Sequence, residues 1–531
     1  MKKNVLKKGV ALLLAGISCV GVGACGKKQV PDTEETLQIW VSDSGYSTKW
    51  LTSMVKVFEE QSWVKEKYPN LIVDVAPSTT AGGSGYTDVI GGPAVCSYDL
   101  IATLQYGNNY FDTTDSNGKF YFEELSSLYE DKVPGEDLTL KEKMRPELYA
   151  MQEVEGKDGS LKYYAVPYLD STMGLLYNEA VMIRAFGADY DMPNTTEEFV
   201  QVCQALVDKG EVPIIGTSSI NYWLQMFIIW WAQYEGIDEY KNFWYGIKDG
   251  EYNGEVTKQL GRKYSLLVCD SLLNAGNGFL HPENTTRDFM YMQRYFETGR
   301  GTFQCNGDWF TSEMNSKAED IRYMRTPVIS YIVEQCTSIK TDAQLSAVVD
   351  YVDANDTFAQ AATKYSEAGH GTLTEADYNK IFEARNAVFS RQGSHFAIPS
   401  YAKGKEVAKD FIRFCATDIA IEAMMDGTDG FISPYNFTPK EGKLANYAPL
   451  WRDRFERLST TRYIPNWTMF RLNYYGGLIP LKMSTNSIDN SFMADNKADR
   501  KNPIAMYESD WKYYLDNNES CWKMVLSRAG L

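Results

Sequence analysis

The chain has 531 residues, of which 44% are hydrophobic, and a formal net charge of −17 at pH 7. This length can bury large cores, and alone it suggests about two to four domains. The negative charge repels phosphate backbones, so we expect no nucleic-acid partner and a neutral rather than an anionic ligand.

The first 25 residues have the layout of a secretory signal. Four lysines precede an apolar run at 10–20, and small residues lead to Cys25. The run is too short to span a bilayer as a stable helix. The ending resembles a bacterial lipoprotein signal, which implies that Cys25 carries the lipid (palmitate) and becomes the first mature residue. We expect an anchor on the outer face of the cytoplasmic membrane of a Gram-positive bacterium; a secreted protein with a chance Cys25 is the alternative.

Strands and helices alternate after a polar tether at 26–36. Apolar patterns predict strands at 37–41, 71–75 and 98–103, and helical spacing predicts a helix over 50–58. This alternation is typical of an α/β domain with a largely parallel sheet. Ligands of such sheets bind at the carboxyl ends of the strands, where the loops 42–47 and 104–111 lie.

A second α/β region begins near residue 165. Strand patterns occupy 163–170, 174–177, 213–216 and 394–399, and helix patterns occupy 196–208, 221–234 and 406–414. The run WLQMFIIWW at 223–231 is the most apolar segment after the signal, and its length predicts a buried core helix. Residues 332–393 are predicted to be a helical insertion.

The residue types give little support for a metal or cofactor. The nine cysteines have no C-x-x-C spacing and the three histidines form no metal-binding pair. Buried free thiols are therefore expected, with no metal and no cofactor. Residues 113–124 resemble a calcium loop, but Asp112 is one place out of register, so we predict a turn and keep a structural calcium as the alternative.

Four segments, in this order, resemble the extracytoplasmic solute-binding proteins of ABC transporters, in particular the carbohydrate-binding family that includes maltose-binding protein. Together they touch most of 37–437. They are LQIWVSDSGYSTKWLTSMVKVFEEQ, YAVPYLDSTMGLLYNEAVMIRAFG, GRGTFQCNGDWF and SHFAIPSYAKGKEVAKDFIRFCA.

The resemblance implies two α/β lobes, each a mixed sheet flanked by helices, joined by a hinge that closes on a ligand. Lobe 1 is expected at 37–166, completed by about 394–437, and lobe 2 at 167–331, completed by about 440–531. The implied function is capture of a carbohydrate, expected to be an oligosaccharide, for delivery to a membrane permease. We expect a monomer that is not an enzyme.

The ligand is expected between the lobes, where aromatic rings meet the C–H faces of a sugar and polar side chains meet its hydroxyls. Trp309 occupies the tryptophan position of the family and is expected to stack on a sugar ring. The other expected contacts are Asp43, Ser44, Gln105, Tyr106 and Asn108 from lobe 1, Asp170, Tyr222 and Trp223 from lobe 2, and Tyr435 and Trp467 from the later chain.

Each of these residues has a structural alternative. Trp309 and Trp223 fit a role in the core, Asp43 fits a helix cap, and Asp170 fits a structural partner at the hinge. The residues of the loop 104–111 fit simple solvation. Two other functions also stay open: a surface glycoside hydrolase, which needs two carboxylates flanking a cleft, and the same fold binding a peptide, a polyamine or a metal chelate.

Overall fold

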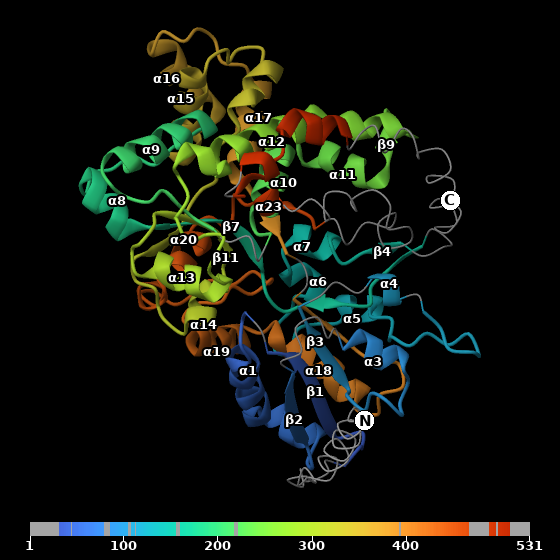
Figure 1. The fold of residues 1–531 in the computed structure, drawn as a ribbon. Coiled ribbons are helices and arrows are strands. Elements are labelled where there is room, and N and C mark those ends of the chain that lie inside the picture. Colours follow the sequence, from blue (N-terminus) through green and yellow to red (C-terminus); the bar gives the residue numbers. More distant parts are fainter. Residues whose placement is uncertain are drawn as a thin grey trace, which may run out of the picture.

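The computed structural model describes residues 31–43, 45–78, 85–104, 108–111, 113–155, 160–216, 221–391, 394–466, 488–494 and 497–509. The expected site residues Ser44, Gln105, Tyr106 and Trp467, and the expected lipid anchor Cys25, lie outside these ranges. Asn108 begins the helix α4 (Asn108–Phe111), but its side chain is not described. Figure 1 shows two α/β bodies, with β1 to β3 in the lower one and β7 and β11 in the upper one.

The sheet of the lower body, lobe 1, has the order β2-β1-β3-β14-β6. The central strand β1 is buried along nearly its whole length, as is typical of a parallel strand covered on both faces. It pairs in parallel with β2 and β3, and β14 adds antiparallel to β3 and β6. The strands are β1 Thr36–Ser42, β2 Ile72–Ser78, β3 Leu100–Thr103, β6 Val166–Pro167 and β14 His395–Ala397.

Amphipathic helices cover this sheet. The helix α1 (Lys49–Glu60) buries Trp50, Leu51, Met54, Val55 and Phe58, a spacing that places all five on one face. It packs against α19. The other helices are α2 Ser62–Lys67, α3 Tyr86–Ile90, α5 Ser126–Glu130, α6 Leu140–Lys143, α7 Pro146–Ala150, α18 Lys405–Cys415 and α19 Asp418–Thr428; β4 Val154–Glu155 and β5 Leu161–Lys162 form a separate antiparallel pair.

The sheet of the upper body, lobe 2, has the order β15-β13-β7-β11-β8, with β12 paired to β7. Its central strand β7 is antiparallel to β11, β12 and β13. The strands are β7 Thr172–Asn178, β8 Ile214–Ile215, β11 Phe303–Gly307, β12 Ile321–Tyr323, β13 Ala387–Ser390 and β15 Arg462–Ile464. Segments far apart in the sequence therefore complete both sheets.

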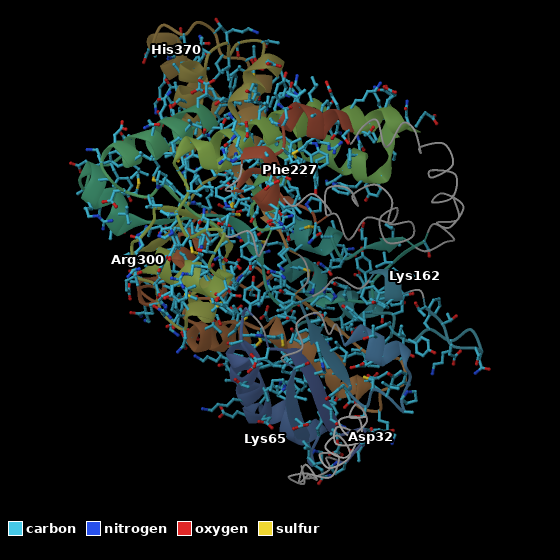
Figure 2. The ribbon with its side chains drawn as sticks, in the orientation of Figure 1. Asp32, Lys65, Lys162, Phe227, Arg300 and His370 are labelled. Atoms are coloured by element: carbon cyan, nitrogen blue, oxygen red, sulfur yellow. The ribbon has the colours of Figure 1, made fainter. Side chains whose placement is uncertain are left out.

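The helix α10 (Trp223–Glu235) forms the core of lobe 2. Nearly all of its side chains are buried, which confirms the prediction of a core helix. Figure 2 shows Phe227 of this helix inside the upper body. Within the described residues, no helix has the length and apolarity needed to cross a bilayer. The other elements are α8 Glu179–Phe186, α9 Thr196–Asp208, α11 Ile237–Tyr245, α12 Leu260–Leu273, α13 Phe289–Glu297, α14 Phe310–Met314, α20 Pro449–Phe455 and α23 Ile488–Phe492, with the pair β9 Ile247–Lys248 and β10 Glu251–Tyr252.

Three helices project from lobe 2 within the range predicted as a helical insertion (Figure 1). They are α15 Asp342–Asp353, α16 Phe358–Glu367 and α17 Glu375–Asn386. The strand β13 comes from the same range but joins the sheet of lobe 2 directly after α17.

The fold class predicted from the sequence is confirmed, and the main deviations are in short elements. Only Val166–Pro167 of the predicted strand 163–170 pairs as a strand, because the residues that follow cross between the lobes. Residues 114–120 form a turn in which Asp115 accepts hydrogen bonds from the backbone of Asn117 and Lys119. The described residues contain no cluster suited to a metal ion, and their six cysteines are buried and unbridged.

Candidate ligand site between the lobes

Three crossing segments connect the lobes and are hydrogen-bonded to one another. The first joins β6 to β7, the second joins β13 to β14, and the third leads from α19 to α20. The backbone nitrogen of Arg391 donates to Ser171 at 2.9 Å, and that of Asp170 donates to Ile432 at 2.9 Å. These backbone bonds tie the crossings into one unit, so a relative motion of the lobes must pivot here.

Asp170 lies at the centre of this unit and is buried. Its Oδ2 accepts hydrogen bonds from Arg145 at 2.8 Å and from Tyr463 at 2.6 Å, and Arg454 lies at 3.4 Å. Arg145 belongs to lobe 1, whereas Tyr463 and Arg454 belong to lobe 2. These partners give Asp170 a structural role at the hinge, and a ligand contact by this residue stays a prediction.

Tyr46 makes a direct contact between the lobes. It follows β1 in lobe 1, and its hydroxyl donates to Oδ1 of Asp308 in lobe 2 at 2.6 Å and is hydrogen-bonded to Ser171. Oδ2 of Asp308 accepts from both the backbone nitrogen and the hydroxyl of Thr172. Burial raises the pKa of Asp308 to about 7, because the ionised carboxylate is poorly solvated there. The Tyr46–Asp308 contact is therefore a buried polar junction with a group that titrates near neutrality.

Trp309 lies at the same junction, directly after Asp308, and is buried. The edges of its ring meet Tyr46 and Tyr222 in T-shaped contacts, with centroids 5.6 Å and 6.1 Å apart. The ring packs closely on Gly307, where an added Cβ would lie 2.0 Å from a ring carbon. The guanidinium of Arg391 lies 4.7 Å from the ring centroid, in the geometry of a cation–π contact. A sugar that stacks on Trp309 must therefore displace Arg391 or enter beside it.

Two further side chains surround Trp309. Tyr222 precedes α10 and packs against Phe289, and burial raises the pKa of its hydroxyl. Glu313 of α14 accepts a hydrogen bond from Gln293 at 2.9 Å, and burial raises the pKa of its carboxyl. Within the described residues, the Arg391 guanidinium has no hydrogen bond and no ion pair beside its contact with Trp309.

The other expected site residues whose side chains are described are Trp223, Asp43 and Tyr435. Trp223 is buried in the core of lobe 2, and its backbone nitrogen donates to Asp489. Asp43 is half-buried at the end of β1, and its backbone nitrogen donates to Ser78. Tyr435 is buried in the third crossing and pairs with Met144 through a β-bridge. Ligand contacts by these three residues stay predictions.

The structure adds Tyr46, Asp308, Glu313 and Arg391 to the residues expected from the sequence. Tyr46 and Asp308 lie in the same motifs as expected site residues, so those motifs already indicated that this part of the chain forms the site. Arg391 carries no local signal, because its position on Trp309 depends on how the second crossing folds back between the lobes.

A polar cavity of about 260 Å³ lies between the lobes, and Phe431 of its lining packs against Tyr46. Its lobe 1 wall comes from the start of α1 and the end of α19, and its lobe 2 wall comes from α14, which lies next to α19 in Figure 1. An ion pair between Lys317 and Asp429, at 3.5 Å, spans the two walls. Hydroxyl, amide and ammonium groups dominate the lining, which suits a ligand rich in hydroxyls. The lining residues are Ser47, Lys49, Thr311, Ser312, Asn315, Ser316, Lys317, Gly427, Thr428, Asp429 and Phe431.

Comparison with known proteins gives one family and several similar structures. The family described as "Bacterial extracellular solute-binding protein" matches residues 44–421. A chitin oligosaccharide binding protein has a TM-score of 0.55 and 14% identity, covering 91% of this chain and 99% of its own. The GacH receptor of Streptomyces glaucescens has a TM-score of 0.55 and 13% identity, covering 91% and 97%. RafE in complex with raffinose has a TM-score of 0.54 and 15% identity, covering 90% and 98%. No curated protein sequence matches the chain.

Proposed function

Because the chain belongs to the bacterial extracellular solute-binding proteins, we propose that it captures a carbohydrate between its lobes and delivers it to an ABC permease. The ligand is an oligosaccharide, bound without chemical change. Binding favours the conformation in which both lobes contact the ligand, by the difference in affinity between the open and closed states.

The residues around Trp309 are the main structural support for this proposal. An indole ring, two tyrosines and the charged groups of Glu313 and Arg391 gather where the lobes touch. Aromatic faces suit the C–H faces of sugars, and charged planar groups form the stronger hydrogen bonds to hydroxyls. The names of similar structures include chitin oligosaccharide and raffinose, which supports a neutral oligosaccharide as the first ligand to test.

Calorimetry with a panel of neutral oligosaccharides tests the proposal, after a thermal-shift screen has selected those that bind. We expect saturable binding of at least one oligosaccharide and no hydrolysis products. The substitution Trp309→Ala should weaken that binding at least tenfold, because it removes the ring at the lobe contact.

Trp63→Ala is a matched control, since Trp63 packs against Phe58 in lobe 1 and should leave affinity unchanged. Equal affinity of the Trp309→Ala variant would contradict the site. Released sugar products would favour a glycoside hydrolase, and binding of peptides or polyamines alone would favour another solute.

Membrane attachment through Cys25 is a separate part of the proposal. Its support is the sequence before Cys25, together with the extracellular assignment of the family. Expression of the full chain in a Gram-positive host should place it in the membrane fraction. The Cys25→Ala variant should carry no lipid label. It should either be released from the cells or remain in the membrane with its signal uncleaved. Unchanged labelling of that variant would contradict the anchor.

A further inference from the structure

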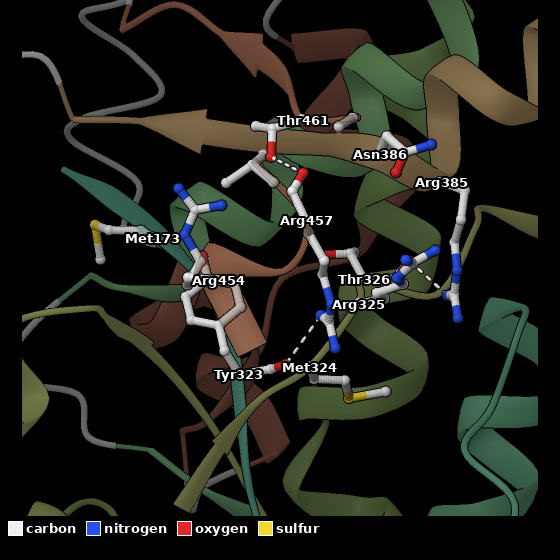
Figure 3. Close-up of a pocket in the computed structure, with 12 residues that line it drawn as sticks. Met173, Tyr323, Met324, Arg325, Thr326, Arg385, Asn386, Arg454, Arg457 and Thr461 are labelled. Carbon is white, nitrogen blue, oxygen red and sulfur yellow. Dashed lines mark hydrogen bonds between the residues drawn. The ribbon is translucent and has the colours of Figure 1, made fainter. Parts of the chain in front are cut away.

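A small cavity in lobe 2 has an unusual lining of four arginines. Figure 3 shows Arg325, Arg385, Arg454 and Arg457 around it, with Tyr323 and Met173. Its volume is about 20 Å³. A cavity of roughly 10–15 Å³ on this measure holds one water molecule, so this one has room for a single small ion or water.

The carboxylates near these arginines are already shared. Asp353 pairs with both Arg325 and Arg385. Asp170 pairs with Arg145 at 2.8 Å and lies 3.4 Å from Arg454, whose buried Nε has no hydrogen-bond partner in the described residues. Asp453 is engaged in a two-point ion pair with Arg322. The four guanidinium groups of the lining therefore have too little negative charge beside them.

Arg457 is the arginine of this lining whose positive charge is least offset by direct hydrogen bonds and ion pairs. Within the described residues its guanidinium has one hydrogen bond, from Nη1 to the carbonyl oxygen of Tyr323 at 3.0 Å, and no ion pair. Burial lowers its pKa to about 10; Asp453 and Asp353 oppose this shift, whereas Arg325 and Arg385 add to it. A guanidinium held against a neutral acceptor in a partly desolvated site is costly, and a nearby anion would offset that cost.

We propose that this arginine-lined cavity binds one small monovalent anion, with chloride as the ion of matching size and charge. Guanidinium N–H groups would hold it, since they are strong donors to anions and stay charged at neutral pH. Because Arg454 also reaches Asp170, the anion would stabilise lobe 2 next to the hinge.

Thermal unfolding of the full chain tests this site. The protein is compared in sodium chloride and in sodium gluconate at equal ionic strength and pH 7.5, because gluconate is too large for the cavity. We expect Tm to rise saturably by about 1–3 °C with chloride and with bromide, as for a ligand that binds the folded state alone. The Arg457→Gln variant should lose this dependence.

Arg287→Gln is the control, because Arg287 is exposed and already paired with Glu283; it should keep the full chloride response. Crystals of the unaltered protein grown in sodium bromide give a readout that does not depend on a variant folding. An anomalous peak beside Arg457 supports the proposal. The absence of this peak, or an equal chloride response in the Arg457→Gln variant, overturns it.

Discussion

Asp308 and Tyr46 form the junction with the clearest chemical consequence. The carboxyl of Asp308 is buried and accepts from Tyr46 on one oxygen and from Thr172 on the other. Three donated hydrogen bonds favour the ionised form, yet burial outweighs them and raises the pKa to about 7. This residue should therefore make the stability of the protein depend on pH.

The sign of that dependence follows from the raised pKa. The unfolded chain loses the Asp308 proton near pH 4, whereas the folded protein keeps it up to about pH 7. The contribution of Asp308 to stability is therefore greatest below about pH 4, falls as pH rises to about 7, and stays lost above. We expect Asp308→Asn to remove this fall, by at most about 4 kcal/mol between pH 4 and pH 8.

Urea unfolding of the two proteins at several pH values measures this difference. Asp137→Asn is the matched control, because the Asp137 side chain is fully exposed. A pH slope that is the same for the Asp308→Asn variant and the unaltered protein would refute the assignment.

The sequence predicted which parts of the chain form the site better than it predicted which residues contact one another there. Trp309 was found from its motif, and it lies at the junction of the lobes. Arg391 was missed, because only the folded crossing segment brings it onto the ring. Asp170 was expected near the hinge, but its arginine partners come from positions 145 and 454, and no local pattern links them to it.

Among the secondary-structure elements, long periodic helices were predicted closely, whereas several short strands were located from the sequence but their pairing was not. The helices α1 and α10 followed from their apolar spacing and length. In contrast, β8 and β6 lie within the predicted strands 213–216 and 163–170 but pair over only two residues each, and β15 was not predicted; all three pair with strands far away in the sequence. Their pairing is set by the sheet that receives them, so local residues contain little information about it.

A buried carboxylate, Asp377, contributes to holding the insertion together. Asp377 lies in the first turn of α17 and accepts hydrogen bonds from the backbone and hydroxyl groups of Thr337 and Ser338, which precede α15. Burial opposes its ionisation, but these hydrogen bonds lower its pKa below the usual value. Asp377 thus connects the start of α17 to the segment before α15, in addition to the ion pair between Arg385 of α17 and Asp353 of α15.

We expect Asp377→Ala to destabilise the insertion by about 2–3 kcal/mol, because several donors lose a charged acceptor. Hydrogen exchange should show faster exchange of amides in α15 and α17, with the sheet of lobe 1 unaffected. Glu375→Ala, an exposed change in the same turn of α17, is the control. Equal exchange rates in the two variants would rule out this role.

Polar side chains join the two lobes outside the crossing segments. Tyr46 reaches Asp308 across the boundary, and Lys317 reaches Asp429. The crossing segments themselves are fixed by backbone hydrogen bonds. A hinge with rigid crossings and a small polar junction can have open and closed states that differ by only a few kcal/mol, which a ligand can offset.

The substitution Tyr46→Phe tests this small free-energy difference between the open and closed states. It keeps the ring contacts with Trp309 and Phe431 but removes the hydroxyl that donates to Asp308. Loss of one buried hydrogen bond to a carboxyl costs about 1.5–3 kcal/mol, and this cost falls on the closed state alone, because open lobes separate these groups. Small-angle scattering should therefore give a larger radius of gyration for the unliganded variant, and a saturating oligosaccharide should restore compactness at a three- to tenfold higher Kd.

Tyr68→Phe is the control, because the Tyr68 hydroxyl donates to Asp410 within lobe 1. If both variants scatter like the unaltered protein, Tyr46 does not hold the lobes together, and closure must depend on the ligand and the crossing segments.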